Sequence, residues 1–196
     1  MSKAYDRIEW NFLSSIMLKM GFNPDFVNLI MLCLSTVTYK ISRDGSEIGP
    51  IVPSRGLRQG DPLSPYLFII CAQGLSSLIN HYEGACMLHG IRIARGAPCL
   101  TDLFFADDCF IFFKANDQEA RVMKAALSLY GAASGQRVNF NKSFISFSAD
   151  TNKVVALSIC SLLGVQGTVN HGNYLRIPSF IGRSNSAVFN YIRERV

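Results

Sequence analysis

This sequence contains no apolar run long enough to cross a membrane. Its longest one, Tyr66 to Ala72, is far shorter than the roughly 20 residues that a bilayer requires. The amino terminus has no basic stretch followed by an apolar core, so we expect no secretory signal. Internal repeats and low-complexity segments are also missing. These absences predict an intracellular protein of the nucleus or cytoplasm, without a transmembrane segment and without a membrane partner.

A zinc site of the usual cysteine type is also excluded. The six cysteines show no Cys-x-x-Cys spacing, and most lie in apolar runs, so we expect reduced core residues and no zinc ligands. The three histidines have no carboxylate or cysteine at ligand spacing, and we assign them no chemistry.

The composition is that of a globular and rather apolar protein. With 196 residues, 49% of them hydrophobic and 17% charged, the chain can form one domain, or one domain with a small appendage. A net charge of +5 makes contact with a polyanion plausible, although charge alone is a weak indication.

Helical patterns and hairpins alternate along the chain. Helices are expected over 10–20, 23–34, 65–80, 116–133 and 152–163, with a further one at the carboxyl end; strands are expected over 38–43, 46–52, 89–94 and 144–148. Capping residues support two helix starts: Asn23, and Asn116 with Glu119 in a capping box. Asp44-Gly45 is a strong hairpin signal. Without a run of parallel strand units, these patterns predict an α+β fold around an antiparallel sheet packed on helices.

Two adjacent acids, Asp107 and Asp108, lie between two apolar and mostly aromatic runs within Leu103–Phe113. The runs are typical of paired strands, with the acids at their turn. In so apolar a setting, two anions would repel each other and lose hydration, which a divalent cation would offset. A metal site and an ordinary polar turn are equally good interpretations of the pair taken alone.

A loop rich in glycine, proline and arginine, residues 55–65, leads directly into an apolar helix. Glycines permit close backbone approach, and a helix start offers free amides to phosphate. The alternative is a loop that merely reverses the chain, but that role requires neither Arg58 nor Gln59.

Four motifs in order suggest a family. They are Lys3-Ala4-Tyr5-Asp6, then Arg58-Gln59-Gly60-Asp61-Pro62-Leu63-Ser64-Pro65, then Phe105-Ala106-Asp107-Asp108, then Ser134-Gly135 through Asn141-Lys142-Ser143. This series resembles the palm of a reverse transcriptase, and more narrowly that of the LINE-type, non-LTR retrotransposons abundant in plant genomes. The resemblance covers nearly the whole chain. It implies a palm over residues 1–150, and a connector with the start of the thumb over 151–196.

The resemblance implies an RNA-directed DNA polymerase that acts on an RNA template, a DNA primer and deoxynucleoside triphosphates. Asp107 and Asp108 match the paired acids of the catalytic hairpin, which with a third aspartate bind two Mg²⁺ ions. The turn thereby becomes a metal site by resemblance.

Further roles transfer residue by residue. Tyr5 matches the bulky side chain that selects deoxynucleotides by crowding a ribose 2′-hydroxyl; its alternative is a core tyrosine on a first strand. Gln59 and Gly60 match contacts to template and incoming nucleotide, and Arg58 would lie close to phosphate. Lys142 matches the proton donor to the leaving pyrophosphate, although a lysine after a loop is usually just solvated.

Three departures from the family accompany these matches. The first catalytic aspartate would stand directly before Met1, the fingers that precede the palm are missing, and Arg176 occupies a position where the family usually carries glycine. Asp6 is no substitute, because on a strand it would point away from the Tyr5 side. We therefore expect a truncated element copy with weak or no polymerase activity. The alternative hypothesis is a noncatalytic remnant that binds nucleic acid or is inert.

Overall fold

The structure, a computed structural model, describes residues 1, 3–168, 173–174 and 177–178. It divides into two compact units, the first formed by residues 1–114 with 118–139 and the second by residues 115–117 with the chain from Phe140 onward. The predicted carboxyl-terminal helix and Arg176 lie outside the described residues.

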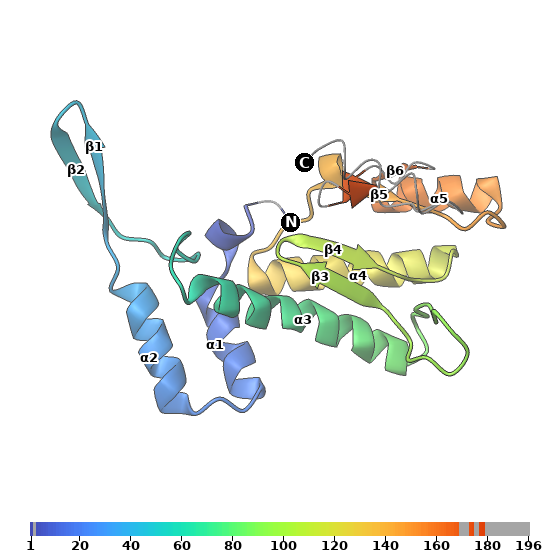
Figure 1. Ribbon diagram of the computed structural model, residues 1–196, viewed down its shortest axis with the longest axis horizontal. Helices are drawn as coiled ribbons and strands as arrows, with labels where there is room; N and C mark the ends of the chain where they lie inside the picture. Colours follow the sequence, from blue (N-terminus) through green and yellow to red (C-terminus); the bar gives the residue numbers. More distant parts are fainter. Residues whose placement is uncertain (2, 169–172, 175–176, 179–196) are drawn as a thin grey trace. The chain divides into compact units, whose positions relative to one another are not determined.

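Most of the helices and hairpins of the first unit begin and end near the predicted positions (Figure 1). Its elements are η1 (Tyr5–Arg7), α1 (Trp10–Lys19), α2 (Pro24–Ser35), β1 (Tyr39–Arg43), β2 (Ser46–Ile51), α3 (Ser64–Gly84), β3 (Asp102–Phe105), β4 (Asp108–Ile111) and nearly all of α4 (Asp117–Ser134). The predicted start of α2 is confirmed, because the Asn23 side chain accepts a hydrogen bond of 2.8 Å from the Asp25 amide.

The β1–β2 hairpin turns at Asp44-Gly45, where both residues have positive φ, as the two-residue hairpin signal predicts. All residues of both strands are exposed. Figure 1 shows the hairpin projecting away from the helices.

Helix α3 carries residues of both hydrophobic clusters in this unit. Leu67 and Phe68 pack in the first cluster with residues of η1, α1 and α2, whereas Leu75 and Ile79 pack in the second with residues of α4. Helix α1 approaches α3 closely at Gly74, where a Cβ atom would lie 2.7 Å from Ile16 Cδ1 and 2.9 Å from Phe12 Cζ. A side chain at Gly74 would displace the ends of the Ile16 and Phe12 side chains, so the close α1–α3 contact favours glycine.

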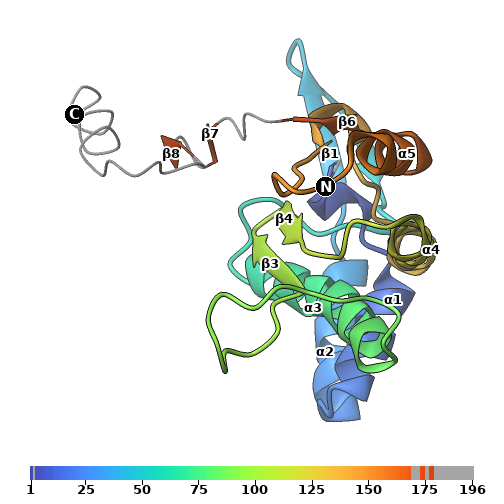
Figure 2. The ribbon, with the colours of Figure 1, turned by 90° about the vertical axis from the view of Figure 1, so that its right-hand side faces the viewer.

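The β3–β4 hairpin has one covered face and one exposed face. Phe104 and Ile111 pack against the second hydrophobic cluster, while Leu103 and Phe105 are 49% and 55% exposed. Both views place the hairpin beside α3 and α4 (Figures 1 and 2). We expected a sheet buried among apolar residues, and only half of that expectation is correct.

The second unit contains short elements. These are η2 (Phe140–Lys142), β5 (Phe144–Ile145), α5 (Lys153–Leu163), β6 (Gln166–Gly167), β7 (Asn173–Tyr174) and β8 (Ile177–Pro178). β5 pairs in parallel with β6, and β7 pairs antiparallel with β8. The predicted helix start at Asn152 is confirmed by a 2.8 Å bond from the Val154 amide to its side chain. The predicted strand over 144–148 is limited to its first two residues.

The α+β prediction is confirmed, but three details are wrong. The described strands form two-stranded sheets and not one larger antiparallel sheet. Residues 5–7 form a 3-10 turn instead of a first strand, and Ala4 before them has helical dihedral angles. The strand expected over 89–94 is reduced to a single bridge between Ile91 and Leu100. Local alternation is a weak signal where no long partner strand is available.

The cysteines form no disulfide among the described residues. Cys71 is buried as expected, but Cys33 and Cys86 are exposed, so the core expectation is wrong for these two. Within the part of the chain that the structure describes, the helices are too short or too polar to cross a bilayer.

Candidate functional site

An open cleft of about 670 Å³ brings together residues that are far apart in the sequence. It is lined by Lys3, Ala4, Tyr5, Gln59, Gly60, Asp61, Pro62, Ser64, Pro65 and Asp107. Four of the predicted site residues, Tyr5, Gln59, Gly60 and Asp107, thus share one cleft of the size of a small-molecule site.

Tyr5 enters the cleft from η1, and its ring is supported from the side of α3. The ring stacks on Phe68 with 5.1 Å between the ring centroids and an interplanar angle of 13°. Because Phe68 is buried, this contact fixes the plane of the tyrosine ring. Phe68 was not predicted as a site residue, because its only signal in the sequence is its place in an apolar helix.

The loop that carries Gln59 and Gly60 is bonded to the turn that carries Tyr5. The Leu57 amide donates to the Tyr5 carbonyl at 2.8 Å, and the Gly56 amide donates to the Ile8 carbonyl at 2.8 Å. Gly56 has a φ of +88°, and a Cβ there would lie 2.9 Å from the Asp6 carbonyl oxygen, so this close approach requires glycine. Backbone bonds therefore couple the two predicted nucleotide-contact segments.

The start of α3 is less open to phosphate than we expected. The Asp61 carboxylate accepts a 2.8 Å hydrogen bond from the Leu63 amide, so that amide is already occupied. Arg58 is exposed and lines a second cleft of about 580 Å³ together with Gln59 and Asp61. Asp6 lines this second cleft and not the first, in agreement with the expectation that it faces away from the Tyr5 side.

The two acids of the hairpin occupy different positions. Phe105 pairs with Asp108, so Ala106 and Asp107 form the two-residue turn and Asp108 begins β4. Both acids are exposed, which overturns the expectation that burial forces a cation upon them. Among the described residues, neither carboxylate has a hydrogen bond or an ion pair in the structure.

These adjacent carboxylates are chemically suited to Mg²⁺. The ion prefers hard oxygen ligands, and it is commonly held by one or two carboxylates with water and substrate phosphates completing its coordination. The described residues contain no cluster of three or more aspartate, glutamate, histidine or cysteine side chains that could hold a metal. The donor set on this hairpin is thus a pair.

Cys109, the residue after the acid pair, lies on the partly covered face of the hairpin beside Phe104. Burial, assisted by the negative charge of Asp102, raises the pKa of the Cys109 thiol to about 12. The thiol therefore stays protonated at neutral pH, which makes this residue a poor nucleophile.

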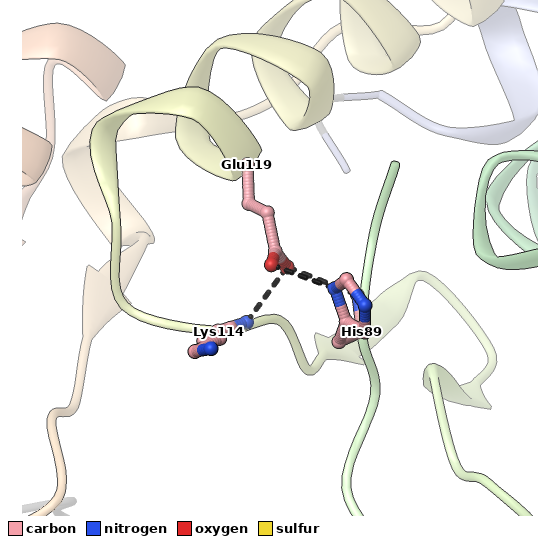
Figure 3. A network of polar contacts seen from close by, with 3 residues as sticks. All are labelled: His89, Lys114 and Glu119. Carbon is pink, nitrogen blue, oxygen red and sulfur yellow. Dashed lines mark hydrogen bonds and ion pairs between the residues drawn. The ribbon is translucent and has the colours of Figure 1, made fainter. Parts of the chain in front are cut away.

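Figure 3 shows the buried Glu119 carboxylate, which binds the segment that follows the β3–β4 hairpin. Glu119 Oε2 accepts hydrogen bonds from the His89 amide at 2.9 Å and the Lys114 amide at 3.0 Å, and Oε1 lies 2.9 Å from His89 Nδ1. Glu119 thereby ties the segment after β4 to the segment after α3. Glu119 was predicted as a capping residue, but its link to His89 was not expected from the sequence.

Lys142 belongs to the second unit, where it is the last residue of η2. Its side chain is exposed, and the described residues give it no ion pair.

The family follows from a comparison of the whole sequence. Residues 1–172 match the family described as "Reverse transcriptase (RNA-dependent DNA polymerase)". The chain belongs to the reverse transcriptase family. The match covers both the cleft and the acid hairpin.

Curated relatives include a plant protein and retrotransposon proteins. The chain is 51% identical over 65 residues to an uncharacterized mitochondrial protein, AtMg01250, of Arabidopsis thaliana, covering 33% of this chain and 53% of that protein. It is 29% identical over 143 residues to a retrovirus-related Pol polyprotein from the type-1 retrotransposable element R2 of Popillia japonica, covering 72% and 19%. It is 25% identical over 141 residues to the transposon TX1 uncharacterized 149 kDa protein of Xenopus laevis, covering 72% and 10%.

This chain therefore spans about half the length of the plant relative and a fifth or less of these two retrotransposon proteins. It is a reverse transcriptase domain of the non-LTR retrotransposon type.

Proposed function

We propose that this chain is the palm part of a LINE-type RNA-directed DNA polymerase of plant origin, which copies an RNA template by extending a DNA primer. Residues 1–150 form the palm, and residues 151–196 form the connector and the start of the thumb. The observation that carries the proposal is the single cleft lined by Tyr5, Gln59, Gly60 and Asp107.

Asp107, which lines this cleft, and Asp108, the next residue along the hairpin, would hold Mg²⁺. When bound, two such ions activate the primer 3′-hydroxyl and stabilise the leaving pyrophosphate. The support for this assignment is the exposure of both carboxylates and their lack of cationic partners among the described residues, which leaves their oxygens free for a metal.

The remaining residues bind and orient the substrate. Tyr5 crowds the position of a ribose 2′-hydroxyl, and its ring is held for that role by the stack on Phe68. Gln59 and Gly60 contact the template and the incoming nucleotide, while Arg58 contacts phosphate from the neighbouring cleft. Lys142 donates a proton to the leaving pyrophosphate.

A third carboxylate can be added beside the acid pair by extending the chain before Met1. The Met1 nitrogen donates to the Asp107 carbonyl at 2.6 Å, so a residue joined to that nitrogen would begin at the turn of the acid hairpin. An aspartate added directly before Met1 would thus stand close to the acid pair. Three carboxylates balance the positive charge of two divalent cations better than two carboxylates do.

Primer extension on an RNA template with Mg²⁺ tests the proposal. The full chain is compared with chains carrying one added aspartate or one added asparagine before Met1, since these additions match in size and differ in charge. We expect the aspartate form to extend the DNA primer well above the asparagine form. If the aspartate form is inert and indistinguishable from its Asp107→Ala variant, the catalytic assignment is wrong.

A second candidate function is nucleic-acid binding without catalysis. It is favoured by the net charge of +5, because a basic chain attracts polyanions. In that case filter binding would detect a primer–template complex whose affinity falls with salt, while every added-residue form stays inert in primer extension.

A further inference from the structure

The turn that carries Tyr5 is held on a second side by the segment that follows α4. The Gln136 side chain donates a 2.6 Å hydrogen bond from Nε2 to the Ala4 carbonyl oxygen, and the Glu9 amide donates to the Ser134 carbonyl at 3.0 Å. Both ends of the stretch from Ala4 to Glu9 are thus bonded to residues 134–136.

Gly135 brings this segment into direct contact with the turn. It has a φ of +76°, and a Cβ atom at this position would overlap the Arg7 carbonyl oxygen. Ser134 adds rigidity, because its hydroxyl donates to the Tyr130 carbonyl at 2.6 Å and accepts from the Gln136 amide at 3.2 Å. The backbone that carries the Gln136 side chain is therefore held in place next to the turn.

Gln136 is only 3% exposed, and its Oε1 has no hydrogen-bond partner within the described part of the chain. An unpaired buried carbonyl oxygen costs stability. Methionine would fill a similar volume without that cost, so packing alone does not explain an amide here. What the amide supplies is the N–H group directed at the Ala4 carbonyl.

The Ala4 carbonyl belongs to the peptide group that joins Ala4 to Tyr5. A bond to this oxygen fixes the plane of that peptide, and with it the direction in which the Tyr5 Cα–Cβ bond points. The opposite side of Tyr5 is fixed by the Leu57 amide and by the Phe68 ring. Gln136 is the side-chain support on the side of α4.

We propose that Gln136 is a positioning residue for Tyr5, and that it thereby sets the discrimination between deoxyribonucleoside and ribonucleoside triphosphates. This inference rests on the proposed function, in which Tyr5 crowds the 2′-hydroxyl. Gln136 does not line the cleft, so it acts through the turn and not on the nucleotide. Exclusion of one hydroxyl by a ring edge depends on small displacements, because contact repulsion is steep.

The test measures binding and does not require turnover. Equilibrium dialysis of the full chain with excess Mg²⁺ gives the dissociation constants of dGTP and GTP, and their ratio is the discrimination. The variants are Gln136→Met, Tyr5→Ala and the double variant. Met123→Ala is the matched control, since Met123 is buried in the second cluster and lies outside the cleft.

We expect wild type to favour dGTP and Tyr5→Ala to lose that preference. Gln136→Met should reduce the ratio by about twofold to tenfold, the range that one neutral hydrogen bond supplies. In the Tyr5→Ala background, Gln136→Met should leave the ratio unchanged, because the residue acts through the ring. Met123→Ala weakens the fold and should lower the apparent affinity for both nucleotides equally.

The failures are distinguishable. If wild type and Tyr5→Ala discriminate equally, or if wild type binds neither nucleotide, the proposed function fails and this inference fails with it. If Tyr5→Ala abolishes discrimination but Gln136→Met retains the wild-type ratio, only the inference is overturned. If Gln136→Met no longer shows a cooperative urea transition, Gln136→Asn replaces it in the test. This variant keeps the amide but is one methylene shorter, and the same changes in the discrimination ratio support or overturn the inference.

Discussion

Replacement of Glu119 measures how firmly the acid hairpin is anchored. In Glu119→Leu, the His89 and Lys114 amides lose the carboxylate oxygen that accepts both of them. Each of the two stranded amides costs about 1–3 kcal/mol, so the variant should lose about 2–6 kcal/mol of unfolding free energy. Glu119→Gln can keep one oxygen for both amides and turn its NH₂ group toward a neutral His89 Nδ1, so only charge is lost. Its cost should be about 1 kcal/mol.

Urea denaturation followed by circular dichroism gives these free energies. His89→Ala is the control for the ring contact, and because the His89 side chain is 58% exposed it should cost less than about 1 kcal/mol. The expected order of destabilisation is Glu119→Leu, then Glu119→Gln, then His89→Ala. If Glu119→Leu is no less stable than Glu119→Gln, then the two amides find other partners and Glu119 does not anchor the hairpin.

Three further predictions use other parts of the structure. Gly74→Val should cost about 1–3 kcal/mol by overpacking the α1–α3 contact, whereas Gly84→Val, where a Cβ meets no atom within 4 Å, should cost clearly less; equal urea midpoints would contradict the packing. Burial raises the pKa of Cys71 to about 12, so little of its thiol is ionised at about pH 8. Iodoacetamide should therefore modify the exposed Cys33 and Cys86 first in the native chain. Early labelling of Cys71, measured by mass spectrometry, would refute this. Binding of a primer–template should weaken as salt rises, and Arg58→Ala should reduce the steepness of that dependence by about one phosphate contact; an unchanged slope would remove Arg58 from the interface.

The elements that could be predicted from the sequence have local causes. The helix starts at Asn23 and Asn152 follow from a side chain that bonds an amide two residues later, and the Asp44-Gly45 turn follows from the ease with which these residues adopt positive φ. Such signals need no partner from elsewhere in the chain. The β3–β4 hairpin was equally predictable from its two apolar runs.

Features that depend on distant partners were missed or wrong. The stretch before Arg7 was expected to be a strand, but bonds from Leu57 and Gln136 hold it as a turn. Those partners lie far away in the sequence, and no local pattern predicts them. The acid pair was expected to be desolvated, yet Asp107 projects from a two-residue turn and is exposed, because only one face of the hairpin is covered.

Binding of Mn²⁺ tests most directly the central claim that the Asp107–Asp108 turn is a metal site. Electron paramagnetic resonance of free Mn²⁺, titrated with the chain as it stands, is compared between wild type and an Asp107→Asn, Asp108→Asn double variant. These substitutions keep the shape of both side chains and remove their charge. We predict that wild type binds Mn²⁺, that Mg²⁺ displaces it, and that the double variant loses this binding. Equal binding by the two proteins would contradict the claim.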